Sequence, residues 1–264
     1  MQLTVYKRNP YDFVLFQHEE PDNSWRKSVE AAIARGISLV DANLAERDMS
    51  GLAAPRADLR KLNVAGSNLH GADLRGCDLA DAQLGGADLD WANLSEANLA
   101  HAYFGGADLS WANLGRAVLH RASLVEANLT GANLSGANLS ESVMNHLNLA
   151  GFDLSDTNFA GADLRGANLS RANLSRANLV GANLQGAFLG GADLTEADLK
   201  NANCEGACFA GTTLMAANLT GANFTNADLS GSNLTQATLR GCSFYGAKLM
   251  WCDMAEVALT FANL

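Results

Sequence analysis

The stretch GADLRGANLSRANLSRANLVGANLQGAFLGGADL, residues 161–194, repeats every five residues. A leucine returns at each fifth position, and a small residue precedes it by two positions. An α-helix returns its apolar residues every three or four positions and a half-buried strand every two. This period fits neither element, so the repeat itself determines the fold.

The same register extends from Leu39 to Leu264 without a shift. It contains 46 centre positions, of which 35 are leucine and five are phenylalanine: Phe104, Phe159, Phe209, Phe224 and Phe244. Two residues before each centre, alanine occupies 31 of the 45 positions from Ala42 to Ala262. The residue between the two is usually Asn or Asp. No projecting loop interrupts the register between Leu39 and Leu264.

This pattern resembles the pentapeptide-repeat family, whose motif is a small residue, Asp or Asn, Leu or Phe, and two variable residues. The resemblance covers residues 39–264. It implies an all-β fold, a right-handed quadrilateral β-helix in which each pentapeptide forms one side and about eleven coils stack at a spacing of about 4.8 Å. The centre and the small residue point inward, and the other three side chains face water.

Packing explains the alternation of large and small inward residues. A narrow interior holds one large side chain per side only if its inward neighbour is small. Asn, Asp, Gly and Ser near the corners suit turns, because they tolerate the required backbone angles or bond to their own backbone. We therefore expect a filled core without a cavity.

Composition excludes several functional classes. The net charge of −10 disfavours direct binding to nucleic acid or to an anionic membrane. The sequence contains no run of 18 apolar residues, so no transmembrane helix is predicted. The first ten residues, MQLTVYKRNP, lack the apolar region of a signal peptide. A cytoplasmic location is expected.

The register predicts that four of the five cysteines point inward as small core residues, Cys77, Cys204, Cys242 and Cys252, and that only Cys208 points outward.

Residues 1–38 precede the repeat and predict a small N-terminal cap, with the repeat domain following at residues 39–264. LTVY at 3–6 and FVLF at 13–16 flank a turn signal and predict a short β-hairpin. PDNS supplies N-cap residues for a helix over WRKSVEAAIARG, which Gly36 ends. We expect this segment to cover the open end of the leucine core. The alternative is a docking helix for a partner.

Two segments depart from the motif. Residues 39–64 place Arg47, Leu52 and Leu62 at small positions and Ala54 at a centre. A charged side chain in the core is costly, so we expect local distortion and an Arg47 side chain that escapes to the end or under the cap. A second coil has Ser142, Leu147, Phe152 and Thr157 at its small positions, which predicts a widened or bent coil.

Residues 76–115 carry six acidic residues and no Lys or Arg. At the coil spacing this is about one charge per 1.6 Å, close to the value of about one per 1.7 Å for duplex DNA. Residues twenty apart should lie directly above one another, which predicts that Trp91 and Trp111 are neighbours on the surface. The predicted partner-binding residues are Asp78, Asp81, Asp88, Asp90, Trp91, Glu96, Asp108 and Trp111.

Near the C-terminal end, apolar residues occupy outward positions. The register then stops at Leu264 with no covering segment, and an open edge favours association. We expect a homodimer whose interface contains Tyr245, Met250, Trp251, Leu259, Phe261 and Leu264. A further domain after Leu264 would leave the same pattern.

Signatures of enzymes are missing from the sequence. It has no phosphate loop, no nucleophile elbow and no HExxH, and its five histidines show no ligand spacing. The spacing of the two cysteines in the CEGAC run at 204–208 is compatible with a metal site. The register, however, places the sulfur of Cys204 inside the coil and that of Cys208 outside. No catalytic residue, cofactor site or metal site is predicted, because polar side chains on convex faces do not converge on a substrate.

Two classes of function fit these observations. The first is a non-enzymatic, acidic, rod-shaped interaction module whose protein partner binds the Trp91/Trp111 face. The alternative comes from the resemblance: quinolone-resistance proteins of the Qnr and MfpA type are dimeric acidic rods that occupy the DNA-binding surface of bacterial type II topoisomerases. It implies a DNA mimic that binds DNA gyrase or topoisomerase IV. The Qnr branch carries projecting loops that this chain lacks, whereas the MfpA branch lacks them too.

Overall fold

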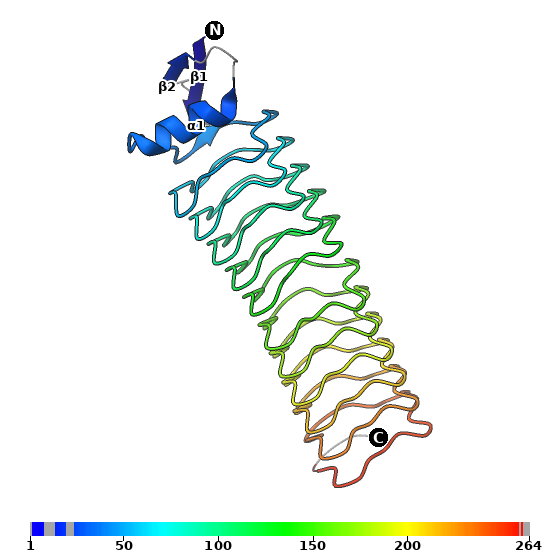
Figure 1. Cartoon of the computed structure of the whole chain (residues 1–264). Coiled ribbons are helices and arrows are strands. Elements are labelled where there is room, and N and C mark those ends of the chain that lie inside the picture. The colour runs from blue at the N-terminus through cyan, green and yellow to red at the C-terminus, as the bar shows by residue number, and fades with distance from the viewer. Residues whose placement is uncertain (1, 8–13, 20–23, 259, 261–264) are drawn as a thin grey trace. The chain divides into compact units, whose positions relative to one another are not determined.

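The protein is described here by a computed structural model that covers residues 2–7, 14–19, 24–258 and 260. The chain forms two compact units, residues 1–134 and residues 135–264. This division does not follow the expected boundary between residues 38 and 39, which stays a prediction. The named elements all lie in the first unit: β1 (Gln2–Lys7), β2 (Val14–Glu19), α1 (Trp25–Ala34) and β3 (Ala42–Asn43) (Figure 1).

The two N-terminal strands form the hairpin that the sequence predicts. β1 pairs antiparallel with β2, with Val5 opposite Phe16. The other edge of β1 pairs antiparallel with β3, with Tyr6 opposite Asn43. The predicted turn at 8–12 lies outside the described residues. The sheet order β2-β1-β3 thus joins the hairpin to the first coil of the repeat.

Helix α1 begins and ends where its local chemistry dictates. Ser24 is the N-cap, and its side chain accepts a hydrogen bond from the backbone N–H of Lys27 at 3.3 Å. At the other end Gly36 adopts a left-handed φ of +67°, which ends the helix. Val29 and Ala32 on one helix face are buried. Both helix boundaries agree with the sequence prediction.

The buried face of α1 lies on the first coil. Val29 contacts the end of the apolar core beside Leu44 and Met49. Glu30 Oε1 accepts a hydrogen bond from the backbone N–H of Ala53 at 3.0 Å, and Arg26 Nη1 donates to the carbonyl of Ser50 at 3.4 Å. These backbone groups belong to the coil that has no preceding coil to pair with. The contacts support a capping role for residues 1–38, which stays a prediction.

The rest of each unit is built from coils of twenty residues. Parallel bridges join residues twenty apart, as in Asp88 to Asp108. The Leu89 N–H donates to the Asp108 carbonyl at 2.7 Å, and the Asp108 N–H donates to the Ala87 carbonyl at 2.9 Å. Because each side is so short, one residue per side makes the bridge, and long strands do not form.

Every corner uses the same backbone device. The second residue after each centre adopts a left-handed φ, such as 58° at Trp91. The Asn or Asp before the centre accepts a hydrogen bond from the N–H two residues later, as Asn113 Oδ1 does from Gly115 at 3.1 Å. Where this residue is Asn, its side-chain amide also donates to the preceding coil, as Asn133 Nδ2 does to Asn113 Oδ1 at 3.0 Å. These bonds explain why the motif has Asn or Asp at this position.

Most inward positions are buried as predicted, although Ala57, Phe152 and the described inward residues from Ala247 onward are partly exposed. Arg47 is the informative exception. Its side chain is exposed and lies over the ring of Trp25 in α1, with the guanidinium carbon 4.6 Å from the ring centroid. The expected escape of Arg47 is therefore confirmed. The distortion expected around it is wrong, because the regular turn pattern continues through residues 45–64. Leu52 and Ala54 are both buried, so the large residue at the small position is offset by a small centre.

The irregular coil at 142–157 widens at its corners. The turn hydrogen bonds from the N–H groups of Leu147 and Thr157 are both 3.3 Å long, whereas the next such bond, from Ala162 to Phe159, is 2.9 Å. Leu147 is buried, but Phe152 stays partly exposed. The small positions therefore accept leucine more readily than phenylalanine.

Candidate functional site

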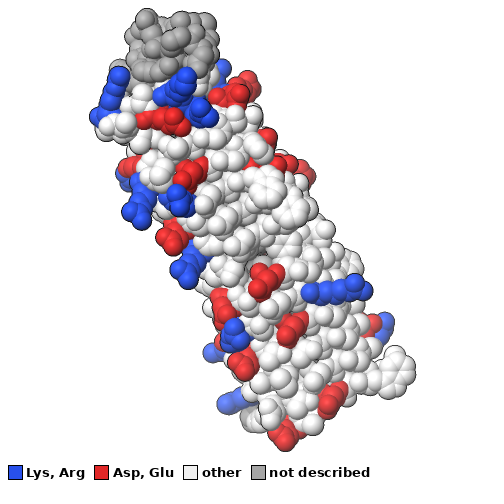
Figure 2. All heavy atoms as spheres, in the orientation of Figure 1, with Lys and Arg blue, Asp and Glu red and all other residues white. Residues whose placement is uncertain are grey.

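The acidic residues between 76 and 115 do not share one face. Residues ten apart lie half a coil apart and hence on opposite sides, since bridges join residues twenty apart. Asp78 and Asp81 are thus opposite Asp88 and Trp91. Glu96 lies at a further corner, where it lines a shallow groove with Arg56 and Arg75. Figure 2 shows side chains of both charges on the face drawn, with oppositely charged ones beside each other in several places.

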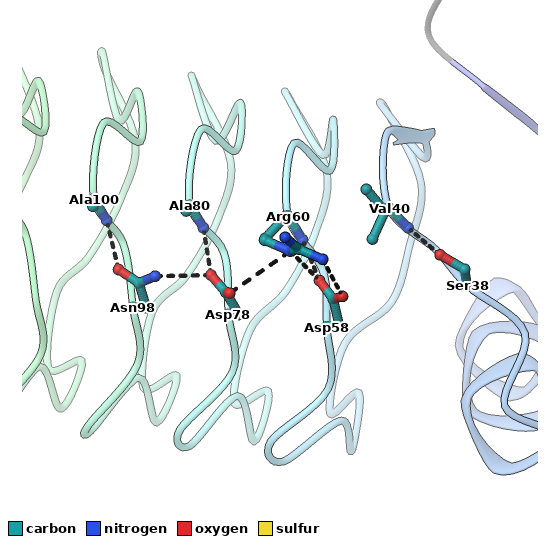
Figure 3. A network of polar contacts seen from close by, with 8 residues as sticks. All are labelled: Ser38, Val40, Asp58, Arg60, Asp78, Ala80, Asn98 and Ala100. Carbon is teal, nitrogen blue, oxygen red and sulfur yellow. Dashed lines mark hydrogen bonds and ion pairs between the residues drawn. The ribbon is translucent and has the colours of Figure 1, made fainter.

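Asp78 belongs to a ladder of paired polar groups. Its carboxylate accepts a hydrogen bond from Asn98 Nδ2 at 2.9 Å and lies 3.7 Å from Arg60 Nε (Figure 3). Arg60 also makes two hydrogen bonds to Asp58, at 2.8 and 2.7 Å. These bonds from Arg60 lower the pKa of the Asp58 carboxyl. Arg60 is thus shared between Asp58 and Asp78, and Asp78 belongs to this ladder rather than to the surface of the tryptophans.

Five of the eight predicted residues do come together, and we call them the Trp91 patch: Asp88, Asp90, Trp91, Asp108 and Trp111. Ser110 Oγ lies 2.6 Å from Asp108 Oδ1 and 3.1 Å from Asp90 Oδ1. His70 Nδ1 lies 3.5 Å from Asp90 Oδ2. The three half-buried carboxylates are thus held in place beside the two tryptophans.

Trp91 and Trp111 stack as the register predicts. Their ring centroids are 5.5 Å apart and the ring planes differ by 13°. The residues are 60% and 54% exposed, so more than half of each is accessible to a partner. Each stands on a left-handed corner, which projects the ring away from the core.

Corner side chains lean over the next coil. A Cβ atom placed on Gly76 would lie 3.3 Å from Arg56 Cγ, and one placed on Gly191 would lie 3.7 Å from Arg171 Cγ. Trp111 also leans over the next coil, because a Cβ atom placed on Gly131 would lie 2.6 Å from the indole ring of Trp111. Glycine at position 131 therefore leaves the space that the indole of Trp111 occupies.

Tyr103 is a further exposed aromatic residue that sequence reasoning missed, and it lies on a different side of the coil from the two tryptophans. Its ring covers the corner glycines Gly85 and Gly105, where an added Cβ atom would collide with the ring. The residue is 46% exposed and lies in the same coil as Asp108 and Trp111. A signal was present: two Gly-Gly pairs twenty residues apart, 85–86 and 105–106, leave room for one large side chain.

Matches to the family described as Pentapeptide repeats cover residues 37–76, 55–90, 72–110, 102–141, 137–176, 177–214 and 217–255. The chain belongs to the pentapeptide repeat family. Proteins of this family form right-handed quadrilateral β-helices, so the fold class expected from the sequence is confirmed. The family consists of structural or interaction modules, and no catalytic family is indicated.

Solved structures of other pentapeptide repeat proteins are similar to this chain. HetL from the cyanobacterium Nostoc sp. strain PCC 7120, involved in the regulation of heterocyst differentiation, is 30% identical over 89% of this chain and 95% of its own, with a TM-score of 0.48. Rfr23 from the cyanobacterium Cyanothece 51142 is 32% identical over 44% of this chain and 88% of its own, with a TM-score of 0.35.

QnrB1, a plasmid-mediated fluoroquinolone resistance protein, is 22% identical over 78% of this chain and 90% of its own, with a TM-score of 0.35. A comparison with curated proteins finds no match. Since all three TM-scores are below 0.5, the structural similarities carry no argument about function.

Among the described residues, no cluster of three His, Cys, Asp or Glu side chains is arranged to hold a metal ion, and no helix is long and apolar enough to cross a membrane. Cys77 and Cys242 donate to the carbonyls of Ala54 and Leu219 at 2.7 and 2.8 Å. Burial raises the pKa of each thiol to about 11, which suppresses the thiolate at neutral pH.

The cysteines follow the register. Cys204 is buried and Cys208 is partly exposed, so the CEGAC pair does not converge on one ligand. Cys252, predicted to point inward, is only half-buried, although its thiol donates to the Leu229 carbonyl at 3.0 Å. Three of the thiols, those of Cys77, Cys242 and Cys252, therefore bond to the backbone.

The contact between Trp111 and Gly131 makes the stack testable. Gly131→Ala should displace the indole and weaken the Trp91–Trp111 stack, because the new Cβ atom would lie 2.6 Å from the ring. Left-handed alanine also costs about 1 kcal/mol. Near-ultraviolet circular dichroism would report the stack, and thermal denaturation the stability.

Gly211→Ala is the matched control, since Gly211 has a similar φ of +67° and a Cβ atom there would meet nothing within 4 Å. It should share the backbone cost and leave the tryptophan signal unchanged. Equal spectra from the two variants would show that Gly131 does not make room for Trp111.

Proposed function

We propose that this chain is a non-enzymatic interaction module whose protein partner binds the Trp91 patch. The observation that carries the proposal is the stacked pair of exposed indoles beside three fixed carboxylates. Tryptophans in the centre of an interface are the residues that most often dominate binding energy. The partner and the patch are expected to meet in the cytoplasm, as the sequence predicts.

The rigidity of the patch supports this role. Trp91 N–H donates to the Ser110 carbonyl at 3.0 Å, and Trp111 N–H donates to the Thr130 carbonyl at 2.8 Å, so both corners are tied to the next coil. Each indole is further fixed by its neighbour. A surface that is already ordered loses little conformational entropy on binding.

The positions of the acidic residues weaken the alternative, a DNA mimic that binds bacterial DNA gyrase or topoisomerase IV. In its favour, Asp88, Asp90 and Asp108 share one face. Against it, Asp78 and Asp81 lie on the opposite side and Glu96 lies with two arginines, so the run from 76 to 115 does not present one continuous charged face. DNA mimicry therefore stays the second candidate.

One experiment separates the two candidates. The partner would be captured from a bacterial lysate, and its binding, along with that of purified gyrase and topoisomerase IV subunits, would be measured by calorimetry at several salt concentrations. For an aromatic anchor, Trp91→Ala and Trp111→Ala should each cost about 1–4 kcal/mol with little dependence on salt.

For a DNA mimic, the triple change of Asp88, Asp90 and Asp108 to Asn should weaken topoisomerase binding, and the affinity should fall with salt. Arg171→Ala, at the same type of corner in the second unit, is the control for both sets. If neither set alters binding to any captured protein, the patch is not an interface.

A second surface supports self-association. Tyr245, Met250 and Trp251 are 71%, 57% and 87% exposed, whereas the other predicted interface residues, Leu259, Phe261 and Leu264, lie outside the described residues. Apolar side chains this exposed favour an interface. We propose that they form part of a homodimer contact.

Replacing Met250 and Trp251 with Glu should convert the dimer to a monomer, because two charges would have to be desolvated in the contact. Multi-angle light scattering measures the mass, and circular dichroism verifies that the β signal is kept. The contact lies elsewhere if the double variant keeps the dimer mass.

A further inference from the structure

The indole of Trp91 has one covered face and one open face. Trp111 covers the first. The second faces Gly71, which occupies the same corner one coil earlier, and a Cβ atom placed on Gly71 would meet no heavy atom within 4 Å. Among the described residues, no other aromatic ring and no Lys or Arg side chain stacks on Trp91. The space beside this ring face is therefore open.

The direction in which corner side chains lean explains this opening. Each leans over the corner of the following coil, as Trp111 does over Gly131 and Arg171 over Gly191. Trp91 accordingly leans toward Trp111 and away from Gly71. Because Gly71 has no side chain to lean over Trp91, the outer ring face lacks the covering that the ring of Trp91 gives Trp111.

The charges around the open face favour a cation. Asp90 immediately precedes Trp91, and its side chain is 28% exposed. Its Oδ2 lies 3.5 Å from His70 Nδ1, and Asp88 lies on the same face. One cationic side chain of the chain itself lies in this direction. Arg26 Nη1 would lie 3.3 Å from a Cβ atom placed on Gly51, which occupies the same corner one coil before Gly71.

Arg26 already has partners of its own, so it does not neutralise the carboxylates of Asp88 and Asp90. Its Nη1 donates to the Ser50 carbonyl at 3.4 Å, and its Nε lies 4.0 Å from Glu30 Oε1. Arg26 lies at the corner of Gly51, which is two coil steps, or about 10 Å, from the corner of Trp91, with Gly71 between them. A single planar group fits such a spacing.

The chain already makes one contact of this kind. The guanidinium of Arg47 lies over the ring of Trp25 at 4.6 Å from its centroid. A planar guanidinium stacks on an indole and at the same time donates in-plane hydrogen bonds to a carboxylate, whereas a lysine ammonium is a point charge with no plane to stack. Trp91 offers the ring, and Asp90 offers the carboxylate.

We propose that the partner presents an arginine side chain that stacks on the open face of Trp91 above Gly71 and donates to Asp90. This inference rests on the proposed function, because it names the group that the Trp91 patch recognises. A cation–π contact of this type changes a dissociation constant by about 2- to 30-fold. The site is therefore one subsite of the interface rather than the whole of it.

The probe is a blocked Gly-Arg-Gly peptide, titrated into the ¹⁵N-labelled protein while the four indole N–H resonances are followed by NMR. The Trp91 resonance should shift, and the Trp25 and Trp251 resonances should not. The matched citrulline peptide, which lacks the charge, should bind at least threefold more weakly, as should the arginine peptide to Asp90→Asn. A lysine or tyrosine peptide that binds as tightly as the arginine peptide would overturn the assignment.

Gly71→Arg tests the position of the subsite. Arginine and alanine are both found at left-handed corners of this chain, at Arg171 and Ala216, with φ of 59° and 57°. An arginine at position 71 should lean over Trp91, fill the open face and abolish the peptide-induced shift, whereas Gly71→Ala should retain it. Equal shifts in the wild type and Gly71→Arg would overturn the proposal.

The failure of this inference and the failure of the proposed function give different results. If Trp91→Ala weakens binding of the captured partner but Gly71→Arg does not, the patch is an interface and the arginine subsite is wrong. If neither change weakens it, the patch itself is not the interface. Should Gly71→Arg fail to fold, Asp90→Asn with the two peptides decides the question.

Discussion

The hydrogen bonds between residues about twenty positions apart determine nearly everything else in this structure. Around the Trp91 patch, each corner and centre N–H is tied to a carbonyl of the adjacent coil at 2.7–3.0 Å. This ladder of hydrogen bonds determines which side chains lie above one another. Residues twenty positions apart therefore form columns along the surface and in the core. The leucine core then fills the inside of a frame whose register the backbone sets. Stacked tryptophans, asparagine ladders and ion pairs follow from that register.

The ladder also imposes a cost at every corner. The described residues include 24 non-glycine residues with a positive φ, among them Trp91, Trp111 and Trp251. Left-handed backbone normally costs an L-residue about 1–2 kcal/mol. Because the conformation occurs at corners throughout both units, it does not mark a functional site, unlike isolated strain in other folds. Its consequence is geometric: it projects corner side chains outward and over the next coil, and it leaves a space wherever the next corner is glycine.

The sequence predicted the features that depend on register alone. It placed Trp91 beside Trp111, buried Cys204 and moved Arg47 out of the core. The assignment of eight residues to one partner-binding face was weaker, because acidic residues close in sequence were grouped by their order along the chain rather than by column. Asp78 and Asp88 are only ten residues apart, and that spacing puts them on opposite sides of a coil. The lean of the corner side chains was not predicted, since it depends on corner torsion angles that residue identity does not reveal. The covering of Gly85 and Gly105 by Tyr103 was not predicted either, because the two Gly-Gly pairs that signal it were not compared by column.

The most direct test of this account changes the register between the two tryptophans. A copy of the pentapeptide 95–99 inserted after Leu99 moves Trp111 one side around the coil relative to Trp91, while the same insertion after Leu79 leaves the two indoles twenty residues apart. Circular dichroism detects the exciton coupling of stacked indoles and the β signal in one spectrum. The account predicts that the insertion after Leu99 abolishes the coupling, that the insertion after Leu79 preserves it, and that both keep the β signal. Coupling that survives the insertion after Leu99 in a folded protein would contradict it.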